Sequence, residues 1–142
     1  KKRRREITPA EFSNFGSSAE ACALLAKHSR FSLEELSPAL TTNFTRITLV
    51  NPTLTERTTI DLELQYQDMR SLRCSSIDKM AIVELKQDGN ITSLTKLLLR
   101  DMRIAPLKVS KYCLGTTLTV ENIKRNRFKE KLQEINKRLN RK

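Results

Sequence analysis

The sequence predicts an α+β fold in which helices pack against an antiparallel β-sheet. Three runs between residues 44 and 87 alternate apolar and polar side chains, which is typical of antiparallel strands. The segments on both sides of these runs show helical spacing instead. The length of 142 residues, with 38% hydrophobic and 30% charged residues, fits one globular domain or a large piece of one. No apolar run comes near the ~20 residues that a membrane span needs, so no membrane span is expected.

Residues 8–28 are predicted to be helical, with an interruption at residues 13–18. Thr8 is expected to be the N-cap, Pro9 takes the first helical position, and Glu11 stands three residues after the cap. These residue types at these positions form a helix start signal, because the Thr and Glu side chains satisfy free backbone N–H groups of the first turn.

The alternating runs, residues 44–50, 56–67 and 80–87, are predicted to be strands, and the polar segment 69–79 a connection. Each strand has one apolar and one charged face. The charged faces carry Arg46, Arg57, Asp61, Glu63, Glu84 and Lys86, and the apolar faces carry Ile47, Ile60, Leu62, Leu64, Tyr66, Val83 and Leu85. Two arrangements fit this alternation: a half-solvated sheet with its charges in water, or a barrel whose charged faces line the interior.

Residues 91–102 and 119–140 are predicted to be helices, each with an apolar stripe at helical spacing. Both stripes need a sheet to cover them. This favours helices outside the apolar faces and leaves the charged faces for a ligand. Residues 110–114 are predicted to form one further helical turn before Gly115.

The net charge of +11 is concentrated at the two ends of the chain. Residues 1–5 carry +5 and residues 119–142 carry +6, whereas residues 6–118 hold thirteen charges of each sign. A sequence pI of about 10 usually indicates a nucleic-acid or membrane-surface binder, but here it describes only the ends. The three cysteines are odd in number and widely spaced, which favours reduced thiols in a cytosol and disfavours a zinc site.

The charged faces indicate the chemistry of a ligand. Three cations lie on them: Arg46, Arg57 and Lys86. Glu84 is a lone acid beside these cations, while Lys108 and Lys111 are three residues apart and are expected on one side of a helical turn. Several cations with one carboxylate suit a polyphosphate with a divalent metal, because the cations neutralise phosphate oxygens and the carboxylate helps to hold the metal. Asp61 and Glu63 are expected to pair with cations of the same face.

Several motifs resemble the vacuolar transporter chaperone (VTC) domain family. Residues 82–86, Ile-Val-Glu-Leu-Lys, look like its Glu-x-Lys strand, and residues 108–115 contain its Ser-Lys-Tyr-x-x-Gly motif. Residues 44–46 and 57–61 are similar to its aromatic-x-Arg and Arg-x-[ST]-[IL]-Asp strand pair, although the family usually has Tyr where this chain has Phe44. The opening residues 1–5 look like the end of an earlier basic strand.

The resemblance implies a triphosphate-tunnel (CYTH-like) fold, an antiparallel barrel whose basic interior binds a nucleoside triphosphate or polyphosphate. It also implies polyphosphate polymerase activity, in which the terminal phosphoryl group of ATP is transferred to a polyphosphate chain with Mn²⁺ or Mg²⁺. The catalytic residues that it implies are Arg46, Arg57 and Lys86, with Glu84 holding the metal. The phosphate-binding residues that it implies are Lys2, Arg46, Arg57, Lys86, Lys108 and Lys111.

By the same resemblance, residues 1–118 correspond to the C-terminal half of the tunnel domain, and residues 119–142 form a basic amphipathic helix. The family's Arg-x-Arg strand and its first Glu-x-Lys strand are not in this sequence. The chain is therefore expected to build half a tunnel, and a second copy in a dimer is one way to complete it. The expected partners are ATP and polyphosphate in the cytoplasm, without nucleic acid.

Two alternative functions stay open. One is a basic nucleic-acid-binding module that uses residues 1–5 and the tail helix. The scattered aromatic residues, five Phe, two Tyr and no Trp, form no stacking platform and disfavour it. The other is a tunnel triphosphatase that hydrolyses the phosphate chain rather than extending it.

Overall fold

The computed structural model describes residues 3–8, 10–11 and 14–140. It separates into two compact units, Lys1–Pro38 and Ala39–Lys142. In the described part of the chain, no helix is both long and apolar enough to cross a bilayer.

The first unit is helical, as the sequence predicts. A 3₁₀ turn, η1 (Phe15–Ser17), precedes the helix α2 (Ala19–His28). The start signal at Thr8 is confirmed, because the Thr8 N–H donates to Glu11 Oε2 at 2.7 Å and the Glu11 N–H donates to Thr8 Oγ1 at 3.3 Å. Residues 3–8 are irregular, so the expectation that the basic opening is the end of a strand is wrong for the described residues 3–5.

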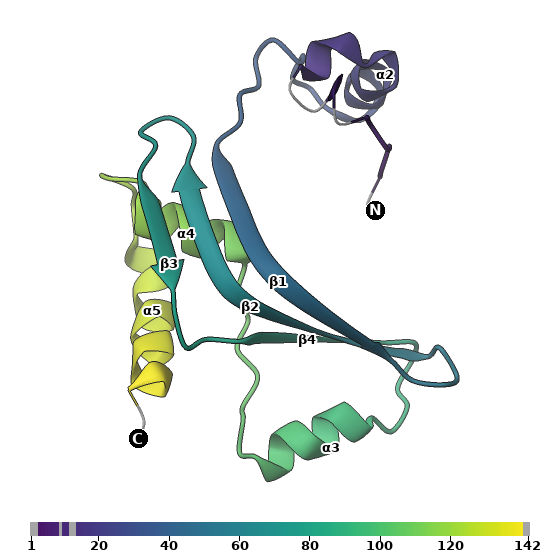
Figure 1. Cartoon of the computed structure of the whole chain (residues 1–142), viewed down its shortest axis with the longest axis vertical. Helices are drawn as coiled ribbons and strands as arrows, with labels where there is room; N and C mark the ends of the chain where they lie inside the picture. Colours follow the sequence, from purple (N-terminus) through teal and green to yellow (C-terminus); the bar gives the residue numbers. More distant parts are fainter. Residues whose placement is uncertain (1–2, 9, 12–13, 141–142) are drawn as a thin grey trace. The chain divides into compact units, whose positions relative to one another are not determined.

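The second unit contains a four-stranded antiparallel sheet (Figure 1). Its strands are β1 (Leu40–Val50), β2 (Glu56–Asp68), β3 (Cys74–Ile77) and β4 (Ile82–Gln87). The long β2 is central, since β1 pairs along one edge while β3 and β4 pair with successive parts of the other. The three predicted strands are confirmed, whereas the short β3 lies in the predicted connection. The sheet is open in the part of the chain that is described, so it is not a closed barrel there.

A β-bulge in β2 changes which side chains share a face. Asn43 pairs with Gln65, but Thr45 pairs with Leu62, so β2 has one extra residue at this point. Glu63 has a φ of 55°, a left-handed conformation that suits a bulge. Because sheet faces alternate with a period of two, the extra residue reverses the alternation beyond it. Leu64 and Tyr66 therefore face the same side as Arg46 and Asp61, and the prediction that they continue the face of Ile60 is wrong.

The hydrophobic core forms where the helix α4 (Lys111–Thr119) lies across the strands on this reversed part of the face (Figure 1). Its buried apolar members are Leu64, Tyr66, Leu114 and Ile135. A Cβ on Gly115 would lie 2.7 Å from Leu40 Cδ2 and closer still to the Tyr66 ring, so the close approach of α4 requires glycine here. The predicted turn 110–114 is thus the start of a longer helix that continues through Gly115.

The remaining helices are α3 (Leu94–Asp101) and α5 (Asn126–Leu139). The α5 stripe is covered as expected, because Ile135 is buried in the core with Leu132 and Leu139 packed against it. The α3 stripe is not covered among the described residues, since Leu94 is 69% exposed and Leu98 54% exposed. The helices also do not all pack on the predicted apolar side: α4 covers the side of Arg46 and Asp61, because the bulge places Leu64 and Tyr66 there.

Candidate functional site

The candidate site is the part of the sheet before the bulge, on the side of Arg46 and Asp61. Residues directly opposite each other in an antiparallel sheet point to the same side. Three rows of directly opposed residues cross β1, β2 and β4 on this side. The first row is Arg46–Asp61–Ile82, and the next two are Thr48–Thr59–Glu84 and Val50–Arg57–Lys86. We call Arg46, Arg57, Thr59, Asp61, Glu84 and Lys86 the polar face. The prediction that Arg46, Arg57, Glu84 and Lys86 share one face is confirmed.

Asp61 is the buried residue of the polar face to which two cations bind. Its side chain is fully buried and accepts from Arg46 twice, with Nε at 2.5 Å from Oδ1 and Nη2 at 2.8 Å from Oδ2. Lys111 forms an ion pair with Oδ2 of the same carboxylate. The Arg46 hydrogen bond, supported by Lys111, holds the pKa of Asp61 below its ordinary value even though burial acts in the opposite direction. Asp61 is therefore ionised at neutral pH and holds both cations in place.

The first turn of α4 determines the position of Lys111. Ser110 is the N-cap of α4, and its hydroxyl accepts from the Cys113 N–H. The packing of Gly115 against Tyr66 then fixes the helix over the strands, so Lys111 reaches the start of the polar face. The Ser-Lys-Tyr motif thus combines a helix start with a lysine directed at the sheet.

Phe44 flanks both of these cations. Its ring centroid lies 5.0 Å from Arg46 Cζ and 5.1 Å from Lys111 Nζ, within the range of cation–π interactions. The aromatic ring and the Asp61 carboxylate together limit the rotamers that the two cations can adopt. A phenyl ring can do this without the hydroxyl that the family usually has at this position.

The other charges of the polar face are more exposed. Lys86 Nζ lies 3.1 Å from Glu84 Oε1, and both side chains are about half exposed, at 57% and 46%. The Lys86 hydrogen bond lowers the pKa of Glu84, so Glu84 is also ionised at neutral pH. Arg57 is exposed, and no ion pair to it is found among the described residues.

One predicted phosphate ligand differs from the pattern, one lies outside the described residues, and the sequence analysis missed one polar residue. Lys108 is exposed in an irregular segment before α4, so it does not share a helical turn with Lys111. Lys2 lies outside the described residues. Thr59 is 8% exposed, and its buried hydroxyl has no hydrogen-bond partner in the described structure, so it is a further, buried polar group of the polar face. Its position between Arg57 and Asp61 on the charged face was the available signal for it.

The polar face offers one carboxylate to a metal. Among the described residues, no three His, Cys, Asp or Glu side chains form a metal-binding group. Asp61 is occupied by two cations, whereas Glu84 is accessible. A single accessible carboxylate is compatible with Mg²⁺ or Mn²⁺, since Mg²⁺ is usually held by one or two carboxylates together with substrate phosphates.

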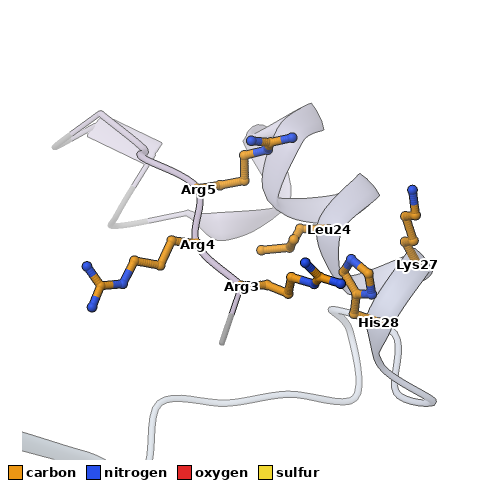
Figure 2. Close-up of a pocket in the computed structure, with 6 residues that line it drawn as sticks. All are labelled: Arg3, Arg4, Arg5, Leu24, Lys27 and His28. Carbon is orange, nitrogen blue, oxygen red and sulfur yellow. The ribbon is translucent and has the colours of Figure 1, made fainter. Parts of the chain in front are cut away.

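A second group of basic side chains lies in the first unit and is organised differently. Arg3, Arg4, Arg5, Lys27 and His28, which we call the N-terminal cluster, line an open cavity of about 420 Å³ together with Leu24 (Figure 2). Arg3, Arg4 and Arg5 lie on the irregular segment, and their side chains are directed to different sides of it (Figure 2). The ion pair between Arg5 Nε and Glu20 Oε2 spans 3.9 Å and is exposed.

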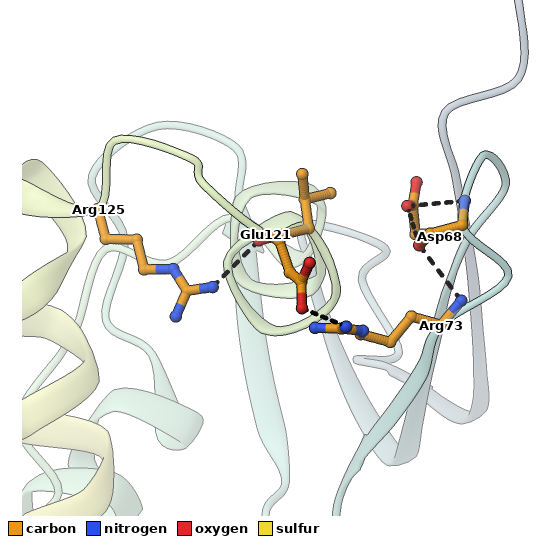
Figure 3. A network of polar contacts seen from close by, with 6 residues as sticks. Asp68, Arg73, Glu121 and Arg125 are labelled. Atoms are coloured by element: carbon orange, nitrogen blue, oxygen red, sulfur yellow. Dashed lines mark hydrogen bonds and ion pairs between the residues drawn. The ribbon is translucent and has the colours of Figure 1, made fainter.

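The basic tail also contributes to structure. Arg125 donates to the carbonyl oxygen of Val120 at 3.0 Å, and Arg73 forms an ion pair with Glu121, which links the segment between α4 and α5 to the start of β3 (Figure 3). Asp68 accepts from the Ser71 hydroxyl in the turn before β3. These contacts lie outside the polar face as defined above.

The family model of the VTC domain matches residues 2–120 of this chain. The match includes the whole sheet and α4, and with them every residue of the polar face. The chain therefore belongs to the VTC domain family. No curated protein and no solved structure matches it.

Proposed function

We propose that this chain is part of a polyphosphate polymerase, which transfers the terminal phosphoryl group of ATP to a polyphosphate chain bound along the polar face. The observation that carries the proposal is the joint placement of Arg46, Arg57, Lys86 and Lys111 at one surface with a single accessible carboxylate. Membership of the VTC domain family supports it.

Each cation would serve one part of a phosphate chain. Arg46 and Lys111, fixed by Asp61, would bind one phosphate group, while Arg57 and Lys86 would bind groups further along β2. Adjacent rows on the same face of a strand are about 7 Å apart. The polar face is therefore suited to an extended anion with charges at several points, as a tri- or polyphosphate has.

Catalysis would depend on positioning and charge neutralisation, since phosphoryl transfer requires little covalent chemistry from the protein. Glu84 would be the residue of the polar face that holds Mn²⁺ or Mg²⁺, together with phosphate oxygens. When bound, such a metal neutralises charge on the phosphoryl group in transfer.

The polar face would form one wall of a tunnel. β1 is an edge strand in the described sheet, and its outer backbone groups are available for pairing with further strands. These strands would come from a longer protein or from a second copy. We place the reaction in the cytoplasm, because all three cysteines are free thiols, which persist in reducing compartments.

The test is a product assay with ATP and Mn²⁺ on a protein that contains this chain. Accumulation of phosphate chains that an exopolyphosphatase degrades is the expected result. Release of inorganic phosphate without chain growth would replace the polymerase by a triphosphatase. A third outcome would reject both enzyme functions in favour of a nucleic-acid-binding module. In that case the wild type does not bind tripolyphosphate, and nucleic-acid binding persists in an Arg46→Ala/Arg57→Ala variant.

A further inference from the structure

Asp61 poses a question that the proposed function does not answer. The proposed site for a polyanion has a fully buried carboxylate in its first row, in contact with two of the cations that would bind phosphate. A carboxylate in this place either competes with phosphate for Arg46 and Lys111, or it holds these two cations in position so that they can bind phosphate. The two possibilities predict opposite effects of its removal.

The hydrogen-bond geometry distinguishes them. Asp61 accepts from the Nε and one Nη2 hydrogen of Arg46, which is the side edge of the guanidinium group. Of the five N–H donors of Arg46, three remain, including the complete Nη1 group. The Arg46 side chain is 41% exposed, so its outer edge remains accessible while its inner edge is bound to Asp61.

Lys111 is in the same situation. Its ammonium group has three donors, of which one is directed at Asp61 and two remain. Its side chain is 20% exposed, which leaves one side open. The Phe44 ring lies against both cations and cannot accept a conventional hydrogen bond, so it restrains them without using these donors.

We propose that Asp61 is a positioning residue: it holds Arg46 and Lys111 side by side with their remaining donors directed outward, as a preorganised cradle for one phosphate group of the chain. This inference rests on the proposed function. Preorganised donors bind an anion more tightly than mobile ones, because little side-chain entropy is lost when the ligand binds.

The test compares two variants that make the same charge change on the same face. Asp61→Asn and Glu84→Gln each remove one negative charge, but only the first releases Arg46 and Lys111. Binding of tripolyphosphate is measured by calorimetry without metal ions, so that the proposed metal role of Glu84 does not enter. Circular dichroism confirms that each variant is folded.

A purely electrostatic role predicts that both variants bind the anion more tightly, since each has lost a repelling charge. The positioning role predicts that Glu84→Gln binds at least as tightly as the wild type, while Asp61→Asn binds about tenfold more weakly. Equal or tighter binding by Asp61→Asn would overturn the positioning role. No binding by the wild type would instead reject the proposed function.

A second variant keeps the test decisive if Asp61→Asn does not fold. Arg46→Lys retains the positive charge but loses the fork that Asp61 holds at two points. We expect binding of tripolyphosphate to weaken about tenfold, and unchanged binding would overturn the proposal. In ¹⁵N-edited spectra, the Arg46 Nε–H signal should be protected from exchange in the wild type and should remain so when tripolyphosphate is added. Loss of protection on binding would mean that Asp61 and phosphate compete.

Discussion

The polar face and the N-terminal cluster both concentrate cations, but they differ in how those cations are held. Arg46 and Lys111 converge on the buried carboxylate of Asp61, with the Phe44 ring alongside. The arginines of the N-terminal cluster lie on an irregular segment, and Arg5 makes a long, exposed ion pair with Glu20. Charge density alone attracts an anion, whereas a defined site also needs donors whose directions are fixed.

The largest difference should appear when the acid of each ion pair is removed. Asp61→Ala should lower the free energy of unfolding by about 2–4 kcal/mol, because Arg46 and Lys111 lose a buried partner and are only partly able to rehydrate. Glu20→Ala should have no measurable effect, since its pair is exposed. Urea unfolding of both variants measures this, and equal values would remove the distinction between the two groups of cations.

Tripolyphosphate binding should depend on the polar face and not on cations elsewhere in the chain. Arg57→Ala should weaken tripolyphosphate binding roughly tenfold to a hundredfold, because a charge-assisted contact to phosphate is lost. Arg125→Ala is the matched control, since this tail arginine donates to the Val120 carbonyl and lies outside the polar face. Calorimetric titration compares them. Equal losses in both variants, or none in either, would place the ligand elsewhere.

The position of α4 can be perturbed through Gly115. In Gly115→Ala the new Cβ would clash with Tyr66 and Leu40, which should cost about 1–2 kcal/mol after the gain in helix propensity is subtracted. Gly89→Ala provides a contrast, because nothing lies within 4 Å of its Cβ position and only its positive φ of 73° opposes the change. Thermal unfolding should show the larger loss for Gly115, and a loss confined to Gly89 would contradict the packing of α4.

Acid should weaken the polar face through Asp61. The pKa of Asp61 is lower in the folded chain than its ordinary value of 3.8, so its contribution to stability is present above that value and is lost as the pH falls through the lower, folded pKa. Asp61→Asn should therefore show a shallower decline of stability below about pH 4 than the wild type. Asp68 and Glu84 also have lowered pKa values, but both remain in the variant. If the stability of the wild type and of Asp61→Asn fell equally with decreasing pH, this role of Asp61 would be excluded.

The smallest effect is expected in the N-terminal cluster. Arg3→Ala/Arg4→Ala should reduce tripolyphosphate affinity less than about threefold, and the reduction should disappear at high salt because exposed charges are screened. Titrations at two salt concentrations measure this. A large, salt-resistant loss would show that the N-terminal cluster forms a defined anion site.

The sequence predicts much of the sheet because its strands alternate over long stretches. Residues 44–50 and 56–67 are correctly identified, and Arg46, Arg57, Glu84 and Lys86 are correctly placed on one face. The bulge could not be predicted, since Glu63 is not a residue type that signals a left-handed conformation. Consequently the sequence also did not predict that Leu64 and Tyr66 face the side of Arg46 and Asp61, or that α4 packs on this side.

The site was predicted in its charges but not in its organisation. Asp61 was expected to pair with cations of its face, and this is confirmed for Arg46; Lys111, which comes from α4, also pairs with it. Glu63 was expected to do the same, but its carboxylate accepts from the Thr45 hydroxyl at 2.7 Å. Nothing in the alternation distinguishes the fully buried Asp61 from the exposed Glu63, because their difference arises from the bulge and from contact with α4.

Titration with tripolyphosphate, followed through backbone and arginine side-chain signals by ¹H–¹⁵N NMR, tests whether phosphate binds at the polar face. Phosphate binding at the polar face predicts that signals of Arg46, Arg57, Thr59 and Lys111 shift first and saturate together, while those of Arg3, Arg4 and Arg5 shift weakly and without saturation. Saturating shifts confined to residues 3–5 or to the tail helix, with the polar face unchanged, would contradict it.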